Sequence, residues 1–164
     1  MVHAIKKEDE TAFLSALPSR DMQLIYMLGK KTGLRVGDLL KLKKDILRTS
    51  RPYVRQEKTG KLKRIYLNKN MLSELKLKSR WSEEYIFENP NTKKPYTRSG
   101  VYKAFRAAAE AAGLSYRVGS HSMRKTYACA ALERTKNLQA VQNRLQHDNI
   151  NDTIGYVVDK FMQK

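Results

Sequence analysis

The sequence is poor in acidic residues, in cysteine and in long apolar runs. Its 164 residues include only 16 aspartate and glutamate residues against 33 lysine and arginine residues. Cys129 is the only cysteine, so an intramolecular disulfide and a cysteine-rich zinc site are both excluded. No run of about 18 apolar residues is present to span a bilayer, and residues 1–7 lack the apolar core of a signal peptide. These absences predict a cytoplasmic protein in a reducing compartment.

The excess of basic residues indicates an anionic partner. The formal net charge is +17 and the sequence pI is near 10.0, which is typical of proteins that bind polyanions. Nucleic acid is the favoured partner, because its backbone offers many phosphates to lysine and arginine. A membrane surface is a weaker alternative, since no basic amphipathic helix with an aromatic face is visible. The length and an apolar fraction of 41% fit one globular domain.

Apolar periodicity predicts a chain made mostly of helices. The helical patterns cover residues 8–17, 21–33, 38–42, 71–75, 99–112, 121–135, 137–145 and 151–158. Short runs of β-type residues at 53–57, 64–67 and 85–87 predict strands. Lys58-Thr59-Gly60-Lys61 separates the first two of these runs, and its glycine suits the positive φ of a hairpin turn.

The last third of the chain holds the most reactive combination of side chains. His121 and Arg124 are three residues apart on an expected helix, so they share a face and can reach one point. Such a pair suits a phosphate, because the planar fork of arginine can hold two oxygens. His147 lies near an expected helix end and Tyr156 on the closing segment. A tyrosine beside cationic groups is a candidate nucleophile.

Five stretches together resemble the catalytic domain of the tyrosine recombinases, the phage integrase family. Residues 32–40 resemble its first arginine box, and residues 58–61 lie where the family has a lysine in a β-hairpin. Residues 121–126 resemble the His-x-x-Arg box, residues 145–147 the Leu-Gly-His box and residues 153–157 the nucleophile box. Their order and spacing extend over nearly the whole chain.

The resemblance implies a fold, an activity and partners. The fold would be α+β, mainly α-helical with a small antiparallel β-sheet. Residues 1–164 would form a single catalytic domain without the family's core-binding or arm-binding domain. The activity would be site-specific recombination or integration of double-stranded DNA by a bacterial, phage or other mobile-element protein associated with the nucleoid. It would use no metal and no cofactor, and would act as a tetramer on DNA and as a monomer when free.

The resemblance also implies a role for each site residue. Tyr156 would attack the scissile phosphodiester and form a 3′-phosphotyrosyl link. Arg35 and Arg124 would hold the nonbridging oxygens, while Lys58 would donate a proton to the departing 5′-oxygen. His121 would assist proton transfer at the tyrosine, and His147 would hydrogen-bond the phosphate.

The chain departs from the family pattern at three positions. Gln146 replaces the usual glycine before the third-box histidine, Lys125 stands where many members have histidine, and Gly155 precedes the tyrosine. Lys61 and Lys63 are close enough in sequence to be confused with Lys58.

The sequence alone leaves several alternatives open. A basic DNA-binding module of the same fold could keep the charge without cleaving DNA. Arg35 could instead cap the helix before it, and His147 could be purely structural. Lysines 41, 43 and 44 and the segment 98–106 are the expected sequence-independent phosphate contacts.

Overall fold

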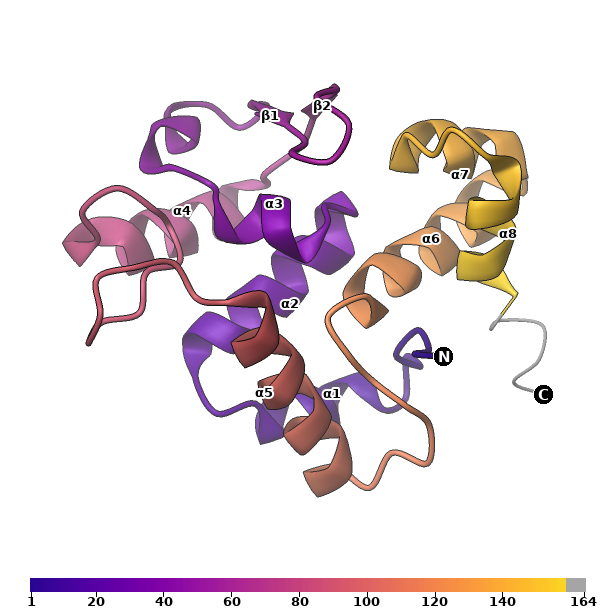
Figure 1. The fold of residues 1–164 in the computed structure, drawn as a ribbon, viewed down its shortest axis with the longest axis horizontal. Helices are drawn as coiled ribbons and strands as arrows, with labels where there is room; N and C mark the ends of the chain where they lie inside the picture. Colours follow the sequence, from indigo (N-terminus) through magenta and orange to yellow (C-terminus); the bar gives the residue numbers. More distant parts are fainter. Residues whose placement is uncertain (159–164) are drawn as a thin grey trace.

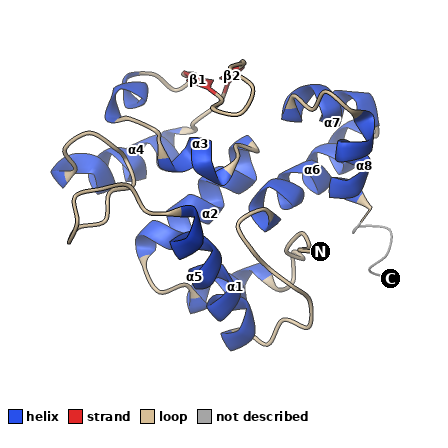
Figure 2. Ribbon diagram, in the orientation of Figure 1, coloured by secondary structure: helices blue, strands red, loops and turns tan. Residues whose placement is uncertain are grey.

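The computed structural model describes residues 1–158, which form a helical protein with one small sheet (Figure 1, Figure 2). The sheet consists of β1 (Tyr53–Arg55) and β2 (Leu62–Arg64), which pair antiparallel with Val54 opposite Lys63. The α-helices are α1 (Glu10–Ala16), α2 (Arg20–Thr32), α3 (Val36–Leu40), α4 (Lys69–Lys78), α5 (Arg98–Ala111), α6 (Ser122–Thr135), α7 (Leu138–Leu145) and α8 (Ile150–Val157). Two 3-10 helices, η1 (Lys44–Arg48) and η2 (Ser79–Trp81), complete these elements. The expected α+β class is confirmed.

Local capping chemistry explains where the helices begin and end. Ser19 precedes α2 and its hydroxyl accepts a hydrogen bond from the Met22 amide, while Gly33 ends the helix with φ of 64°. Thr97 and Asn137 cap α5 and α7 in the same way. The predicted helix end at Gly33 is therefore confirmed. Along residues 1–158, no helix combines the length and the apolarity needed to cross a bilayer.

The predicted strand at residues 85–87 is wrong. This segment makes only an isolated bridge, between Tyr85 and Lys43. The Glu88 carboxylate accepts hydrogen bonds from the amides of residues 83, 84 and 85, so these donors do not need a neighbouring strand. Ile86 and Phe87 are fully buried, and their apolar character reflects core packing rather than a sheet. The first hairpin strand is shorter than predicted, and the second begins two residues earlier, so that it overlaps the predicted run 64–67 only at Arg64.

The core has two parts. The larger part surrounds α2, where Phe13, Tyr26 and Phe105 pack edge-to-face with ring centroids 5.2–6.1 Å apart. A smaller cluster joins α6, α7 and α8, at the right of Figure 1, and consists of Ala128, Ala131, Val141, Leu145 and Val157. Residue Tyr156, on α8, packs against this smaller cluster.

Candidate active site

Arg35 lies at the sharp corner between α2 and α3. Gly33 allows this corner, because it takes a left-handed conformation and a Cβ at this position would lie 2.6 Å from the Tyr127 ring. The Arg35 guanidinium donates a hydrogen bond to the side-chain oxygen of Gln56, at the base of the hairpin. Arg35 therefore points to the hairpin. A different arginine donates a hydrogen bond to the main-chain oxygen at the end of α2.

That arginine is Arg124, in the first turn of α6. Its guanidinium donates to the main-chain oxygens of Gly33 and Leu145, the latter at 2.8 Å, and the side chain is only 1% exposed. Within residues 1–158 it forms no ion pair with a carboxylate. Burial and the nearby Arg35 lower the pKa of Arg124 to about 10, so it is still cationic at neutral pH. A buried cation without an anionic partner is costly, and an anion bound beside it would offset that cost.

His147 is held in one tautomer by its neighbours. Its Nε2 atom lies 3.1 Å from Nη2 of Arg124, and an arginine can only donate. The Nδ1 atom therefore carries the hydrogen and donates to the Thr153 hydroxyl oxygen at 3.0 Å. Burial, followed by the charges of Arg124 and Arg35, lowers the pKa of His147 to about 4. The ring is consequently neutral at physiological pH.

Tyr156, the half-buried tyrosine of α8, meets both histidines. Its hydroxyl oxygen lies 3.3 Å from Nδ1 of His121, and its ring packs edge-to-face on His147 with centroids 5.0 Å apart. The Arg124 guanidinium carbon and the Lys125 ammonium lie 6.0 and 5.9 Å from the tyrosine ring centroid. Burial and the charge of Arg124 lower the pKa of His121. A neutral His121 can accept the phenolic proton.

Lys58 is exposed in the loop of the hairpin, and this loop is tied down on one side by α3 and α5. The buried carboxylate of Asp38 accepts a hydrogen bond from the Glu57 amide at 2.8 Å. The Glu57 carboxylate in turn binds Lys41 at 2.6 Å and Arg98 at 3.0 Å. These contacts hold the residue that precedes Lys58 in a defined position.

The other side of the hairpin is joined to the corner between α7 and α8, beside it at the top of Figure 1. Gln146 adopts φ of 54°, the left-handed conformation that glycine takes easily. Its side-chain oxygen accepts from the Gln56 amide group, and its own amide group donates to the Leu62 carbonyl at 2.9 Å. Lys61 and Asp148 form an ion pair across the same junction. The residue that replaces the usual glycine therefore connects the hairpin to the helices.

These elements enclose one cleft of about 910 Å³. It brings together the candidate residues from four separate parts of the chain, namely Arg35, Lys58, His121, His147 and Tyr156. Arg124 lies beneath its floor, in contact with His147. Lys63, which the sequence did not single out, is buried below the hairpin. No local signal in the sequence identifies it, because on β2 the apolar Leu62 is exposed and the charged Lys63 is buried.

The helical fold carries a cleft with two arginines, two neutral histidines and a tyrosine. This arrangement is expected of a phosphodiester strand-transfer protein. The chain belongs to the phage integrase family, whose sequence model matches residues 2–162. It is 30% identical over 136 residues to the "Probable integrase/recombinase YoeC" of Bacillus subtilis (strain 168), covering 81% of this chain and 75% of that protein. It is also 30% identical over 160 residues to the "Tyrosine recombinase XerA" of Thermococcus kodakarensis, covering 92% of this chain and 56% of that protein.

Solved structures share the fold. A lambda integrase dimer bound to a COC′ core site matches with a TM-score of 0.80 at 22% identity, covering 96% of this chain and 48% of that one. The lambda integrase catalytic core matches with a TM-score of 0.74 at 24% identity, covering 88% of this chain and 91% of that one. The chain spans about half the length of the tyrosine recombinase XerD of Listeria innocua, with 48% of that protein covered.

Proposed function

We propose that this chain is the catalytic domain of a site-specific DNA recombinase that cuts and rejoins double-stranded DNA through a covalent 3′-phosphotyrosine. The observation that carries this proposal is the position of the Tyr156 hydroxyl, 3.3 Å from Nδ1 of a neutral His121. A cationic Arg124 lies behind the tyrosine ring. A module that only binds DNA has no use for a nucleophile, a proton acceptor and two arginines at one point.

The proposed reaction conserves the number of phosphodiester-type bonds. His121 takes the phenolic proton as the Tyr156 oxygen attacks phosphorus, and the bond from phosphorus to the 5′-oxygen breaks. Lys58 gives a proton to that departing oxygen, which leaves a free 5′-hydroxyl. In the second half, a 5′-hydroxyl attacks the phosphotyrosine, and the protons return to the tyrosine and the lysine.

The two arginines would stabilise the charge that develops on the nonbridging oxygens. Arg35 lines the cleft, and Arg124 can reach from below with donors that Gly33, Leu145 and His147 leave unused. His147, neutral and fixed by Thr153, would orient Arg124 and contact the phosphate. We propose that these fixed charges make the reaction independent of a metal ion, because they supply the electrostatic stabilisation directly.

The proposed partner is duplex DNA. The net charge of +17 supports a footprint of many phosphates, to which lysines 41, 43 and 44 and the segment 98–106 would contribute. One structural neighbour is titled as a lambda integrase tetramer bound to a Holliday junction, which supports a tetramer on DNA for this chain too. We propose a monomer in the absence of DNA and a place in the bacterial cytoplasm, with the nucleoid.

Trapping of a covalent adduct tests the proposed chemistry. Supercoiled plasmid in EDTA would be incubated with the protein, quenched with SDS and scored for relaxation and for protein–DNA adducts. We expect adducts with the unaltered protein and none with Tyr156→Phe. Tyr66→Phe is the matched control, because Tyr66 is 60% exposed on the hairpin side of the molecule, and it should behave like the unaltered protein.

A second substrate separates cleavage from binding. A duplex nicked close to the cleavage site loses its short 5′-hydroxyl fragment, so an adduct accumulates instead of being resealed. Tight DNA binding with no adduct on either substrate would refute the enzyme and favour the non-catalytic binding module. Adducts that disappear with EDTA would refute only the independence from metal.

A further inference from the structure

Lys63 is a buried lysine that the proposed reaction does not use. It lies on β2 between Leu62 and Arg64, which are exposed, so the alternation of the strand turns Lys63 inward. The residue is only 7% exposed, and its Nζ atom has no hydrogen-bond partner among residues 1–158. The atom lies 5.2 Å from the ring centroid of Tyr127. A lysine in this setting is unusual, because lysine is almost never fully buried unless it is paired.

The groups around Lys63 are mostly cationic. Arg124 has the strongest influence, Arg35 the next, and the single carboxylate of Asp38 acts against them. The charged and titratable groups that face Lys63 are Arg35 from the corner, Asp38 from α3, Arg124 and Tyr127 from α6, Arg144 from α7 and His147 from the segment after it. Burial, together with the arginines, lowers the pKa of Lys63 to about 7. Much of the amine is therefore uncharged in the free protein.

A phosphate in the cleft would reverse this balance. It would bring negative charge to Arg35 and Arg124, the same two groups that disfavour a proton on Lys63. Charges that interact through a protein interior are weakly screened, so the phosphate would favour the ammonium form strongly. The Nε atom of Arg124 is also buried without a partner within residues 1–158. Nζ of Lys63 and Nε of Arg124 are thus two buried, unsatisfied groups that an added proton or a bound anion can serve.

We propose that Lys63 is a positioning residue of the active site, an uncharged amine beneath Arg35 and Arg124 that takes up a proton when a phosphodiester binds to them. It would act through the arginines and touch no reacting atom. The free protein would avoid a further buried cation near Arg124, and the complex would gain a positive charge close to the bound phosphate. This inference depends on the proposed function, since it concerns how the same cleft accepts DNA.

Calorimetry measures the predicted proton directly. Binding of a short duplex at pH 8 and low salt would be titrated in two buffers that differ in their enthalpy of ionisation, and the difference gives the number of protons taken up. We expect the unaltered protein to take up about 0.5–1 proton more per bound duplex than Lys63→Met. The difference should shrink at pH 6, where Lys63 is already protonated in the free protein.

Lys61→Met is the matched control, because Lys61 lies on the same hairpin but is exposed. It should keep the proton uptake of the unaltered protein, although its DNA affinity falls. Equal uptake by the unaltered protein and Lys63→Met would overturn the inference while leaving the recombinase proposal intact. Failure of the unaltered protein to bind duplex DNA at all would overturn both.

Discussion

Replacing Lys63 by methionine should stabilise the folded protein at neutral pH. Methionine has a similar length, and its thioether can occupy the apolar space beside Tyr127 without a charge. The pKa of Lys63 is about 7 in the folded protein against 10.5 for the unperturbed side chain. At about 1.36 kcal/mol for each pKa unit, folding at pH 7 is opposed by roughly 4 kcal/mol at this one residue. After allowing for the lost contact of the amine with Tyr127, we expect a net gain of about 2–4 kcal/mol.

The pH dependence has a definite sign. Between pH 7 and 10.5 the unfolded chain binds a proton at Lys63 that the folded chain does not, so the stability of the unaltered protein rises with pH in this range. The advantage of the methionine variant should therefore be largest near pH 7 and decline toward pH 10. Urea unfolding followed by far-ultraviolet circular dichroism at pH 7, 8.5 and 9.5 measures both quantities.

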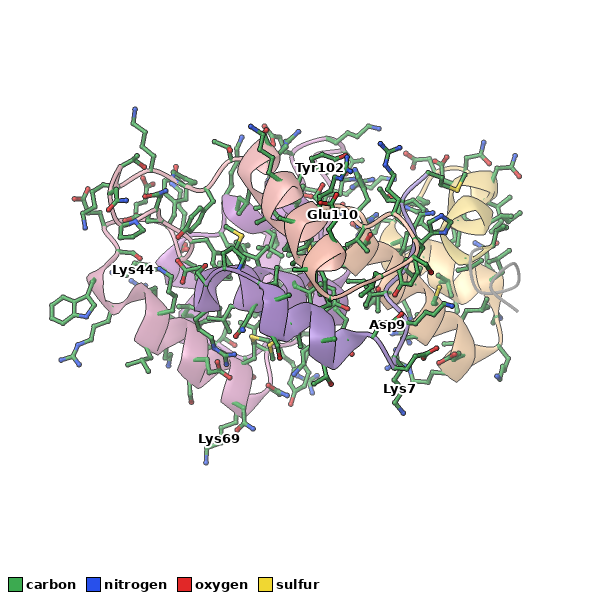
Figure 3. The ribbon with its side chains drawn as sticks, turned by 90° about the horizontal axis from the view of Figure 1, so that it is seen from below. Lys7, Asp9, Lys44, Lys69, Tyr102 and Glu110 are labelled. Atoms are coloured by element: carbon green, nitrogen blue, oxygen red, sulfur yellow. The ribbon has the colours of Figure 1, made fainter. Side chains whose placement is uncertain are left out.

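Lys69→Met serves as the control in this experiment. Lys69 extends from the start of α4 into solvent (Figure 3), and its loss should change stability by less than about 0.5 kcal/mol at every pH. If Lys63→Met were less stable than the unaltered protein, or if its difference from that protein were constant with pH, Lys63 would be an ordinary charged lysine in the fold. The proposal for proton uptake would then lose its physical basis.

Three other outcomes follow from the site. Arg35→Lys should lower the rate of adduct formation on a nicked duplex about 10²–10³-fold, since lysine lacks the planar fork with which arginine can hold two oxygens while it donates to Gln56. An unchanged rate would exclude Arg35 from the transition state. Gln146→Ala should be less stable than Gln146→Gly by about 1 kcal/mol in urea unfolding, because both lose the hydrogen bonds but only alanine keeps the strain of φ at 54°. The folded pKa of His147 is about 4 against 6.5 when unperturbed, so the unfolded state binds the extra proton and stability should fall by about 2–3 kcal/mol from pH 6.5 to 4. His147→Asn should flatten that decline, and an unaltered slope would show that another group titrates.

The helical framework was largely predictable because its signals are local. Ser19, Gly33 and Asn137 act at the positions where the sequence suggests helix boundaries, and they need no distant partner to do so. The order of the family boxes likewise predicted five residues that line the cleft, whereas the sixth, Arg124, lies beneath it. Their catalytic roles are still predictions.

The features that were not predictable depend on contacts between distant segments. The apolar run at 85–87 reads as a strand, but the Tyr85 amide donates to the Glu88 carboxylate and the segment forms only an isolated bridge, to Lys43. Lys63 reads as one of several surface lysines, and only the tertiary structure buries it and brings it near Tyr127. Gln146 reads as a departure from a glycine. Its side chain nevertheless forms hydrogen bonds with Gln56 and Leu62, which precede it by 90 and 84 positions in the sequence.

Helix α8 buries few residues, and this has a consequence for the exchange of its amide hydrogens. Only Thr153 and Val157 are buried on this helix, whereas α2 buries seven residues, and Gly155 has no atom within 4 Å of where a Cβ would be. The amides of α8 should therefore exchange through local opening, at a free energy well below that of global unfolding, while those of α2 exchange only with the whole molecule. Tyr156 lies on this segment, so local opening of α8 would move its side chain while Arg35 and Arg124, which lie on other elements, stay in place.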